Sequence, residues 1–195
     1  MFNLKPFFRL LYKIKCSSLI EANPDLYEEL LTKNRNAAGI QTCLSTKKEV
    51  ETVQFDASGP YGGIMNGENL KPGEAASREI ALKNAKNPGK KHSQYFRRTL
   101  QMQCLPLTSI ILALGNPTID YFSLDIEGAE FLVLKSIDFQ VVDIRVISVE
   151  VTKIDNIFDG KLTQLKYLMK RNGYELYKEV GEDYIYVKTN NKDEL

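Results

Sequence analysis

Apolar positions recur along the chain at two spacings, one typical of buried strands and one of helices with a single packed face. Short apolar or alternating runs that end at polar turns predict strands: residues 17–23, 39–44, 49–55, 98–104, 119–125 and 144–151. Apolar residues three to four positions apart predict helices: residues 24–33, 106–114, 129–137 and 161–170. Residues 174–177 and 184–187 are expected to form a terminal antiparallel pair. The alternation of strands and helices predicts one α/β domain with a mostly parallel sheet.

Two segments depart from this alternation. Residues 1–16 mix Phe and Leu with Lys and Arg, which predicts an amphipathic helix, with a membrane-surface helix as the alternative. Arg9 interrupts the apolar stretch that a signal peptide needs. Residues 56–97 hold six of the twelve glycines and many lysines. They predict a long basic loop that is solvated rather than a specific phosphate site.

Composition narrows the range of functions. The formal net charge of +1 gives no support to a nucleic-acid partner, and we expect none. The apolar runs are too short to cross a bilayer. Three cysteines are too few for a disulfide scaffold, and no His/Cys cluster has metal-ligand spacing, so no zinc site is predicted. Asp125 and Glu127 could in principle join Glu150 around a divalent cation, but helix capping with hydrogen bonds to a substrate is the simpler interpretation, and no metal is assigned. The single histidine, His92, is expected to be a solvent-facing loop residue rather than a catalytic base.

Four acidic residues stand at the ends of predicted strands: Glu21, Asp125, Glu127 and Glu150. In α/β sheets, ligands bind beyond the carboxyl ends of the strands. A carboxylate at such a place can accept both hydroxyls of a ribose. The alternative is that these acids cap the helices that follow them. Their spacing alone does not decide between the two interpretations.

Two motifs resemble the FkbM-type methyltransferase family. Residues 122–130, FSLDIEGAE, with Val-Leu-Lys at 133–135, resemble the family's D-x-E-G-A-E…L-K motif. Residues 19–25, LIEANPD, resemble its E-P-N-P segment. The EANP form and the sequences at 43–45, 62–64 and 104–107 are similar to the animal Star-like branch of the family. The resemblance runs from about residue 17 to residue 187, and residues 189–195 form a polar tail outside it.

The resemblance implies a Rossmann-like class I methyltransferase fold that uses S-adenosylmethionine. Glu21 would bind the cofactor ribose, and Asp125, Glu127 and Glu150 would act in catalysis near the transferred methyl group. Glu130 also matches the motif but lies one turn into the helix, where its role is expected to be structural. The methyl acceptor would be a small molecule or a glycan.

One family feature is lacking. Family members begin with a strand and a glycine-rich loop of the form G-A-x-D-G, which lets the backbone approach the methionine part of the cofactor. Residues 1–16 contain no glycine. We therefore expect the first strand of the sheet to be missing and cofactor binding to be impaired. The alternative is a non-catalytic Star-like factor in the trafficking of cargo proteins between ER and Golgi.

The chain ends in Lys-Asp-Glu-Leu at 192–195, the form of an ER-retention signal. This predicts the lumen of the ER or Golgi, or the cytoplasm if no entry signal exists. In an oxidising lumen, Cys43 and Cys104 would pair and leave Cys16 free. In a reduced cytosol they would be two buried thiols. Both alternatives stay open at this point.

Overall fold

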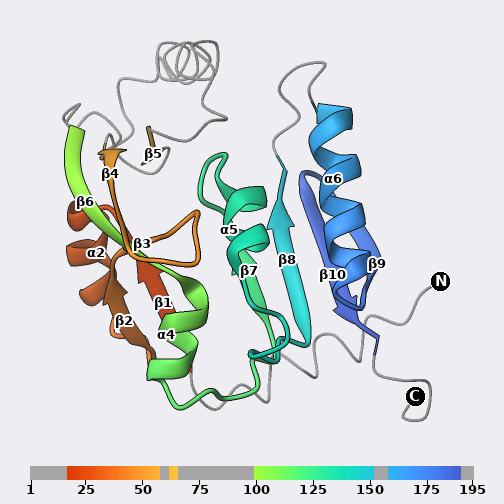
Figure 1. The fold of residues 1–195 in the computed structure, drawn as a ribbon. Helices are drawn as coiled ribbons and strands as arrows, with labels where there is room; N and C mark the ends of the chain where they lie inside the picture. The colour runs from red at the N-terminus through yellow and green to blue at the C-terminus, as the bar shows by residue number, and fades with distance from the viewer. Residues whose placement is uncertain (1–16, 58–61, 66–98, 152–157, 190–195) are drawn as a thin grey trace.

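The computed structural model describes residues 17–57, 62–65, 99–151 and 158–189. The predictions for residues 1–16, for most of the 56–97 loop and for the tail therefore lie outside the described residues. Figure 1 shows the arrangement of the elements. The helices are α2 (Pro24–Leu31), α4 (Leu107–Ala113), α5 (Glu130–Ser136) and α6 (Phe158–Arg171). The strands are β1 (Ser18–Glu21), β2 (Ala38–Gln41), β3 (Cys43–Leu44), β4 (Glu51–Asp56), β5 (Gly63–Ile64), β6 (Thr99–Leu105), β7 (Phe122–Leu124), β8 (Val146–Glu150), β9 (Tyr174–Val180) and β10 (Asp183–Lys188).

The described strands form three hydrogen-bonded groups, in the orders β1-β2, β3-β6-β4-β5 and β7-β8-β10-β9. Three strand pairs are parallel (β1–β2, β3–β6 and β7–β8) and four are antiparallel. The prediction of a mostly parallel sheet is therefore wrong, and the sheets are mixed. The predicted β9–β10 hairpin is confirmed, but β10 also pairs antiparallel with β8. A tight turn at Gly181, whose φ is 66°, reverses the chain and makes the antiparallel pairing possible.

The single strand predicted at residues 39–44 is two strands in two different groups. β2 pairs with β1, whereas β3 pairs with β6. Thr42 lies between them, and its hydroxyl donates to the carbonyl of Gln103 at 3.1 Å. A Cβ added to Gly39 in β2 would lie 3.0 Å from the hydroxyl oxygen of Tyr27. Glycine at this position therefore lets α2 approach the strand closely.

Local sequence explains where the helices begin and end. The side chain of Asn23 accepts from the backbone N–H of Asp25 at 3.0 Å, and Pro24 occupies the first turn of α2. Gly173 follows α6 with a φ of 80°, a conformation that glycine adopts readily. None of the described helices is long and apolar enough to cross a membrane.

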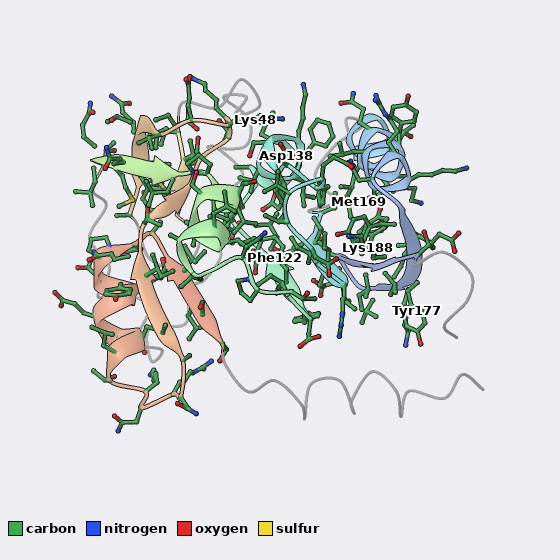
Figure 2. The ribbon with its side chains drawn as sticks, turned by 60° about the horizontal axis from the view of Figure 1, so that its bottom comes forward. Lys48, Phe122, Asp138, Met169, Tyr177 and Lys188 are labelled. Atoms are coloured by element: carbon green, nitrogen blue, oxygen red, sulfur yellow. A yellow bond between two sulfur atoms is a disulfide. The ribbon has the colours of Figure 1, made fainter. Side chains whose placement is uncertain are left out.

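Two groups of buried residues form the interior. The large core cluster has eighteen buried residues from β3, β7, β8, β9, β10, α4, α5, α6 and their connections, and α5 and α6 cover one face of the β7-β8-β10-β9 sheet (Figure 1). Met169 lies between α6 and this sheet, whereas Tyr177 points away from it (Figure 2). The small core cluster has six buried residues: Cys43, Val53, Phe55, Ala57, Ile64 and Cys104.

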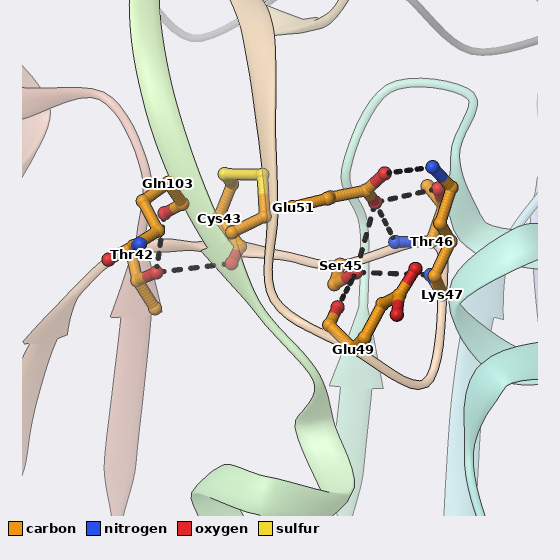
Figure 3. Close-up of a disulfide and its surroundings, with 9 residues drawn as sticks. Thr42, Cys43, Ser45, Thr46, Lys47, Glu49, Glu51 and Gln103 are labelled. Atoms are coloured by element: carbon orange, nitrogen blue, oxygen red, sulfur yellow. Dashed lines mark hydrogen bonds and ion pairs between the residues drawn. A yellow bond between two sulfur atoms is a disulfide. The ribbon is translucent and has the colours of Figure 1, made fainter.

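A disulfide joins Cys43 and Cys104 inside the small core cluster (Figure 3). The two residues are partners in the parallel register of β3 and β6, and their Cα atoms are 4.4 Å apart. The adjoining turn is held by Glu51, whose carboxylate accepts from the backbone N–H of Thr46 at 2.6 Å and from the Ser45 hydroxyl at 3.0 Å. Of the two alternatives for these cysteines, the structure has the disulfide.

Candidate active site at the strand ends

Asp125 and Glu150 meet at the carboxyl ends of two neighbouring strands. Because β7 and β8 are parallel and Leu124 is in register with Val149, the residues that follow them lie side by side. The carboxyl of Glu150 shares a hydrogen bond with Asp125, which raises the pKa of Glu150 to about 8. Burial contributes to this rise, as do the negative charges of Asp125, Glu127 and Glu182. Glu150 is therefore mostly protonated at neutral pH, and its minor deprotonated fraction can accept a proton.

Glu127 lies in a turn whose left-handed backbone conformation is unfavourable for a residue with a side chain. Its φ is 60° and that of Gly128 is 111°, both in the left-handed region. The carboxylate of Glu130 accepts from the backbone N–H of Ile126 at 2.9 Å and from that of Gly128 at 3.0 Å. Glu130 is 9% exposed, and burial raises its pKa more than these hydrogen bonds lower it. Glu130 was expected to be structural, and its hydrogen bonds show what it does: they hold the turn that carries Glu127.

Glu21 ends β1 and is half-buried. Its Oε1 accepts from the backbone N–H of Asn23 at 2.7 Å, and the N–H of Ala22 also points at the carboxylate. Burial raises the pKa of Glu21, and these two hydrogen bonds offset part of the rise. Asn23 is fully buried, and its Nδ2 donates to the carbonyl of Ala57 at 3.1 Å. The segment after β1 is therefore anchored to the end of β4.

The four predicted site acids border the same parts of the interior, although they do not all touch. Ile20, Ile126 and Val151 adjoin the acids in sequence and pack against the large core cluster. Ala22 and Ala129 pack against the small core cluster. The structure brings Asp125, Glu127 and Glu150 together, whereas the hydrogen bonds of Glu21 stay within its own turn.

Sequence reasoning missed Glu182. It lies in the turn before β10, and its carbonyl accepts from the backbone N–H of Val151 at 2.9 Å. The antiparallel register that places Asp183 opposite Glu150 brings the Glu182 carboxylate near the site. The alternation of buried residues at 184–187 predicts the strand that follows Glu182. It does not reveal that this strand pairs with β8 as well as with β9.

The arrangement of carboxyl groups is suited to moving protons. In the described parts of the chain, no three His, Cys, Asp or Glu side chains are placed to hold a metal ion together. A carboxyl that titrates near pH 8 beside a second carboxylate can give up or accept one proton near neutral pH. Acid–base chemistry on a bound hydroxyl or amine is the reaction such a pair can support.

Comparison with protein-family models finds a match to the methyltransferase FkbM domain over residues 6–176. The matched range contains Glu21, Asp125, Glu127 and Glu150. It also extends into the N-terminal segment that the motif resemblance left out. No curated protein and no solved structure gives a significant match to the chain.

Proposed function

The chain belongs to the FkbM methyltransferase domain family, and on this premise we propose that it is a methyltransferase-like protein whose binding of S-adenosylmethionine is impaired. Membership of the family suggests S-adenosylmethionine as the cofactor in general. The acceptor would be a hydroxyl or amine of a small molecule or glycan. Asp125, Glu127 and Glu150 would orient the acceptor and remove its proton.

The observation that carries this proposal is the carboxyl pair at the ends of β7 and β8. Methyl transfer requires that donor and acceptor be positioned and that a proton be removed from the acceptor. A general base is most effective when its pKa lies near the working pH. The pKa of about 8 at Glu150, set first by its hydrogen bond to Asp125, meets that condition.

The residues present fit the cofactor only in part. Glu21 suits a ribose, because backbone N–H groups fix its carboxylate at the end of β1. The methionine part needs a glycine-rich turn, and no glycine precedes Gly39 in this chain. In the described part of the chain, β1 pairs only with β2 and β7 only with β8, so one edge of each has no strand beside it.

Calorimetric titration of the chain with S-adenosylmethionine tests the impairment. We expect a dissociation constant of about 1 mM or weaker. Glu21→Gln should weaken any remaining binding further, whereas Glu175→Gln on the exposed strand β9 should not change it. A micromolar dissociation constant would contradict the proposed impairment and leave an active methyltransferase as the better interpretation.

A second candidate function is favoured by the disulfide. Disulfides persist in oxidising compartments, and the C-terminal sequence has the form of an ER-retention signal. A non-catalytic Star-like factor that handles cargo proteins in the lumen of the ER or Golgi would combine these features. Full-length protein expressed in animal cells should then cofractionate with lumenal ER proteins, resist added protease until membranes are opened, and carry the Cys43–Cys104 bond by non-reducing mass spectrometry. A reduced protein in the cytosolic fraction would exclude this function.

A further inference from the structure

The turn that carries Glu127 must be held in place by something outside itself. Glu127 and Gly128 both have positive φ, and this conformation is unfavourable for a glutamate. The turn also places the negative charge of Glu127 near Glu150, where Asp125 and Glu182 already contribute negative charge. Both backbone strain and charge repulsion therefore favour a turn that opens toward solvent.

Glu130 opposes both tendencies. It lies in the first turn of α5, and its Oε1 accepts from the backbone N–H groups of Ile126 and Gly128 at 2.9 and 3.0 Å. Its Oε2 also accepts from Gly128 at 3.0 Å. These two N–H groups lie on either side of Glu127. A side chain that only capped α5 would have no need to reach Ile126, four residues back in the chain.

The backbone that carries the Glu130 side chain is held by core packing and not by the 126–128 turn. Its neighbours Val133 and Leu134 on α5 have no exposed surface and belong to the large core cluster. Ala129 packs against the small core cluster. The carboxylate of Glu130 therefore projects from a rigid support, which is what a group that positions a strained turn requires.

We propose that Glu130 is a positioning residue for the acidic site, which holds the 126–128 turn so that Asp125 and Glu127 stay beside Glu150. The catalytic meaning of that site rests on the proposed function, but the positioning does not. Loss of the Glu130 carboxylate would release the turn, and the two neighbouring carboxylates would move away from Glu150. Glu150 would then lose the hydrogen bond and the charges that now favour its protonated form.

The test is an NMR titration of the side-chain carboxyl carbons in the full chain. In the unmodified chain, Glu150 should titrate near pH 8. In Glu130→Ala, which removes the acceptor of both backbone N–H groups, the pKa of Glu150 should fall by at least about one unit, a tenfold loss of proton affinity. The amide resonances of Ile126 and Gly128 should shift in the same variant. Glu51→Ala is the matched control, because Glu51 at the start of β4 also holds a turn through backbone and hydroxyl donors, but that turn is the β3–β4 connection.

A second variant covers the case in which Glu130→Ala fails to fold. Gly128→Ala strains the same turn through its φ of 111° and leaves Glu130 in place. It should lower the pKa of Glu150 in the same direction. A folded Glu130→Ala or Gly128→Ala protein in which Glu150 still titrates near pH 8 overturns the proposal, as does an equal fall in Glu51→Ala. Because neither cofactor nor acceptor is present in this measurement, its result is independent of whether the protein transfers methyl groups.

Discussion

The large and small core clusters are stabilised in different ways. The large core cluster buries eighteen apolar residues between a four-stranded sheet and its helices, whereas the small core cluster buries six. Apolar burial contributes roughly in proportion to area, so the small core cluster gains much less from it. Two of its six residues form the disulfide, and Asn23 ties its edge to β1 by hydrogen bonds. Covalent and polar links therefore replace burial where the core is small.

This difference bears on the candidate site, which lies where the two clusters meet. Asp125 and Glu150 end strands of the large core cluster and are placed by it. Glu21 ends β1, whose following residue Ala22 packs against the small core cluster. The position of Glu21 relative to the carboxyl pair thus depends on the links that stabilise the small core cluster. Changes in either cluster should separate the two contributions.

Reduction of the disulfide is expected to have the largest effect. The bond closes a loop between residues 61 positions apart, which on the chain-entropy model stabilises the fold by about 4 kcal/mol. Urea unfolding with and without reductant measures this difference. The double variant Cys43→Ala/Cys104→Ala serves as the control, because its stability should not respond to reductant. Equal stability of the oxidised and reduced chain would show that burial alone stabilises the small core cluster.

Truncation inside the large core cluster should come next. Leu134 on α5 has no exposed surface, and Leu134→Ala should lower the free energy of unfolding by about 3 kcal/mol through lost burial and a cavity. Leu112→Ala on α4, at a position 47% exposed, should cost less than about 1 kcal/mol. Urea unfolding of both variants gives the comparison. Similar losses for the two would mean that the large core cluster is not the source of stability assigned to it.

Asn23 tests the polar links at the edge of the small core cluster. Asn23→Ala removes the hydrogen bond to Ala57 and the cap of α2, and should cost about 2 kcal/mol. Asn23→Ser keeps an acceptor for the N–H of Asp25, but its shorter side chain does not reach the carbonyl of Ala57. Its loss relative to the unmodified chain therefore reports on the link between β1 and β4, which circular dichroism during urea unfolding can measure. If Asn23→Ser were as stable as the unmodified chain, that link would contribute nothing.

Much of the fold follows from local patterns in the sequence. The Asn-Pro-Asp start of α2 and the alternation in β9 and β10 are local signals, and the structure has both elements. The insertion of β10 between β8 and β9 is not local, because strand neighbours depend on contacts between distant segments. The exchange of partners at Thr42 was missed for the same reason. The mixed sheets result from these two non-local choices.

The site shows the same division between local and non-local information. The sequence predicted that Glu21, Asp125 and Glu150 would end parallel strands of one sheet. The strands before Asp125 and Glu150 are parallel neighbours, whereas β1, which ends at Glu21, belongs to a separate group of strands. The motif placed Glu130 on a helix and assigned it a structural role, but not the amides that it binds. The hydrogen bonds to these amides depend on the left-handed turn at Glu127. The residue types in this segment are common at helix starts and do not predict such a turn. Glu182 lies near the site only because of the register of β10 with β8, which the sequence does not reveal.

The smallest effect is expected for a polar link at the edge of the large core cluster. Lys188 ends β10, and its Nζ lies 2.7 Å from Oδ1 of Asp143 (Figure 2 labels Lys188). This hydrogen bond and charge lower the pKa of Asp143 below its ordinary value of 3.8. A carboxyl whose pKa is lowered by folding contributes stability above its unfolded pKa, and that contribution is lost as the pH falls below it.

Because half of the Asp143 side chain is exposed, solvent screens the pair, and Lys188→Met should cost less than about 1 kcal/mol at pH 7. The difference between variant and unmodified chain should vanish as the pH falls through 3.8 and below, whereas Lys178→Met on the exposed strand β9 should show no such dependence. Urea unfolding at a series of pH values measures both. A loss above about 2 kcal/mol for Lys188→Met would show that the large core cluster also depends on polar links, and the contrast between the two clusters would fail.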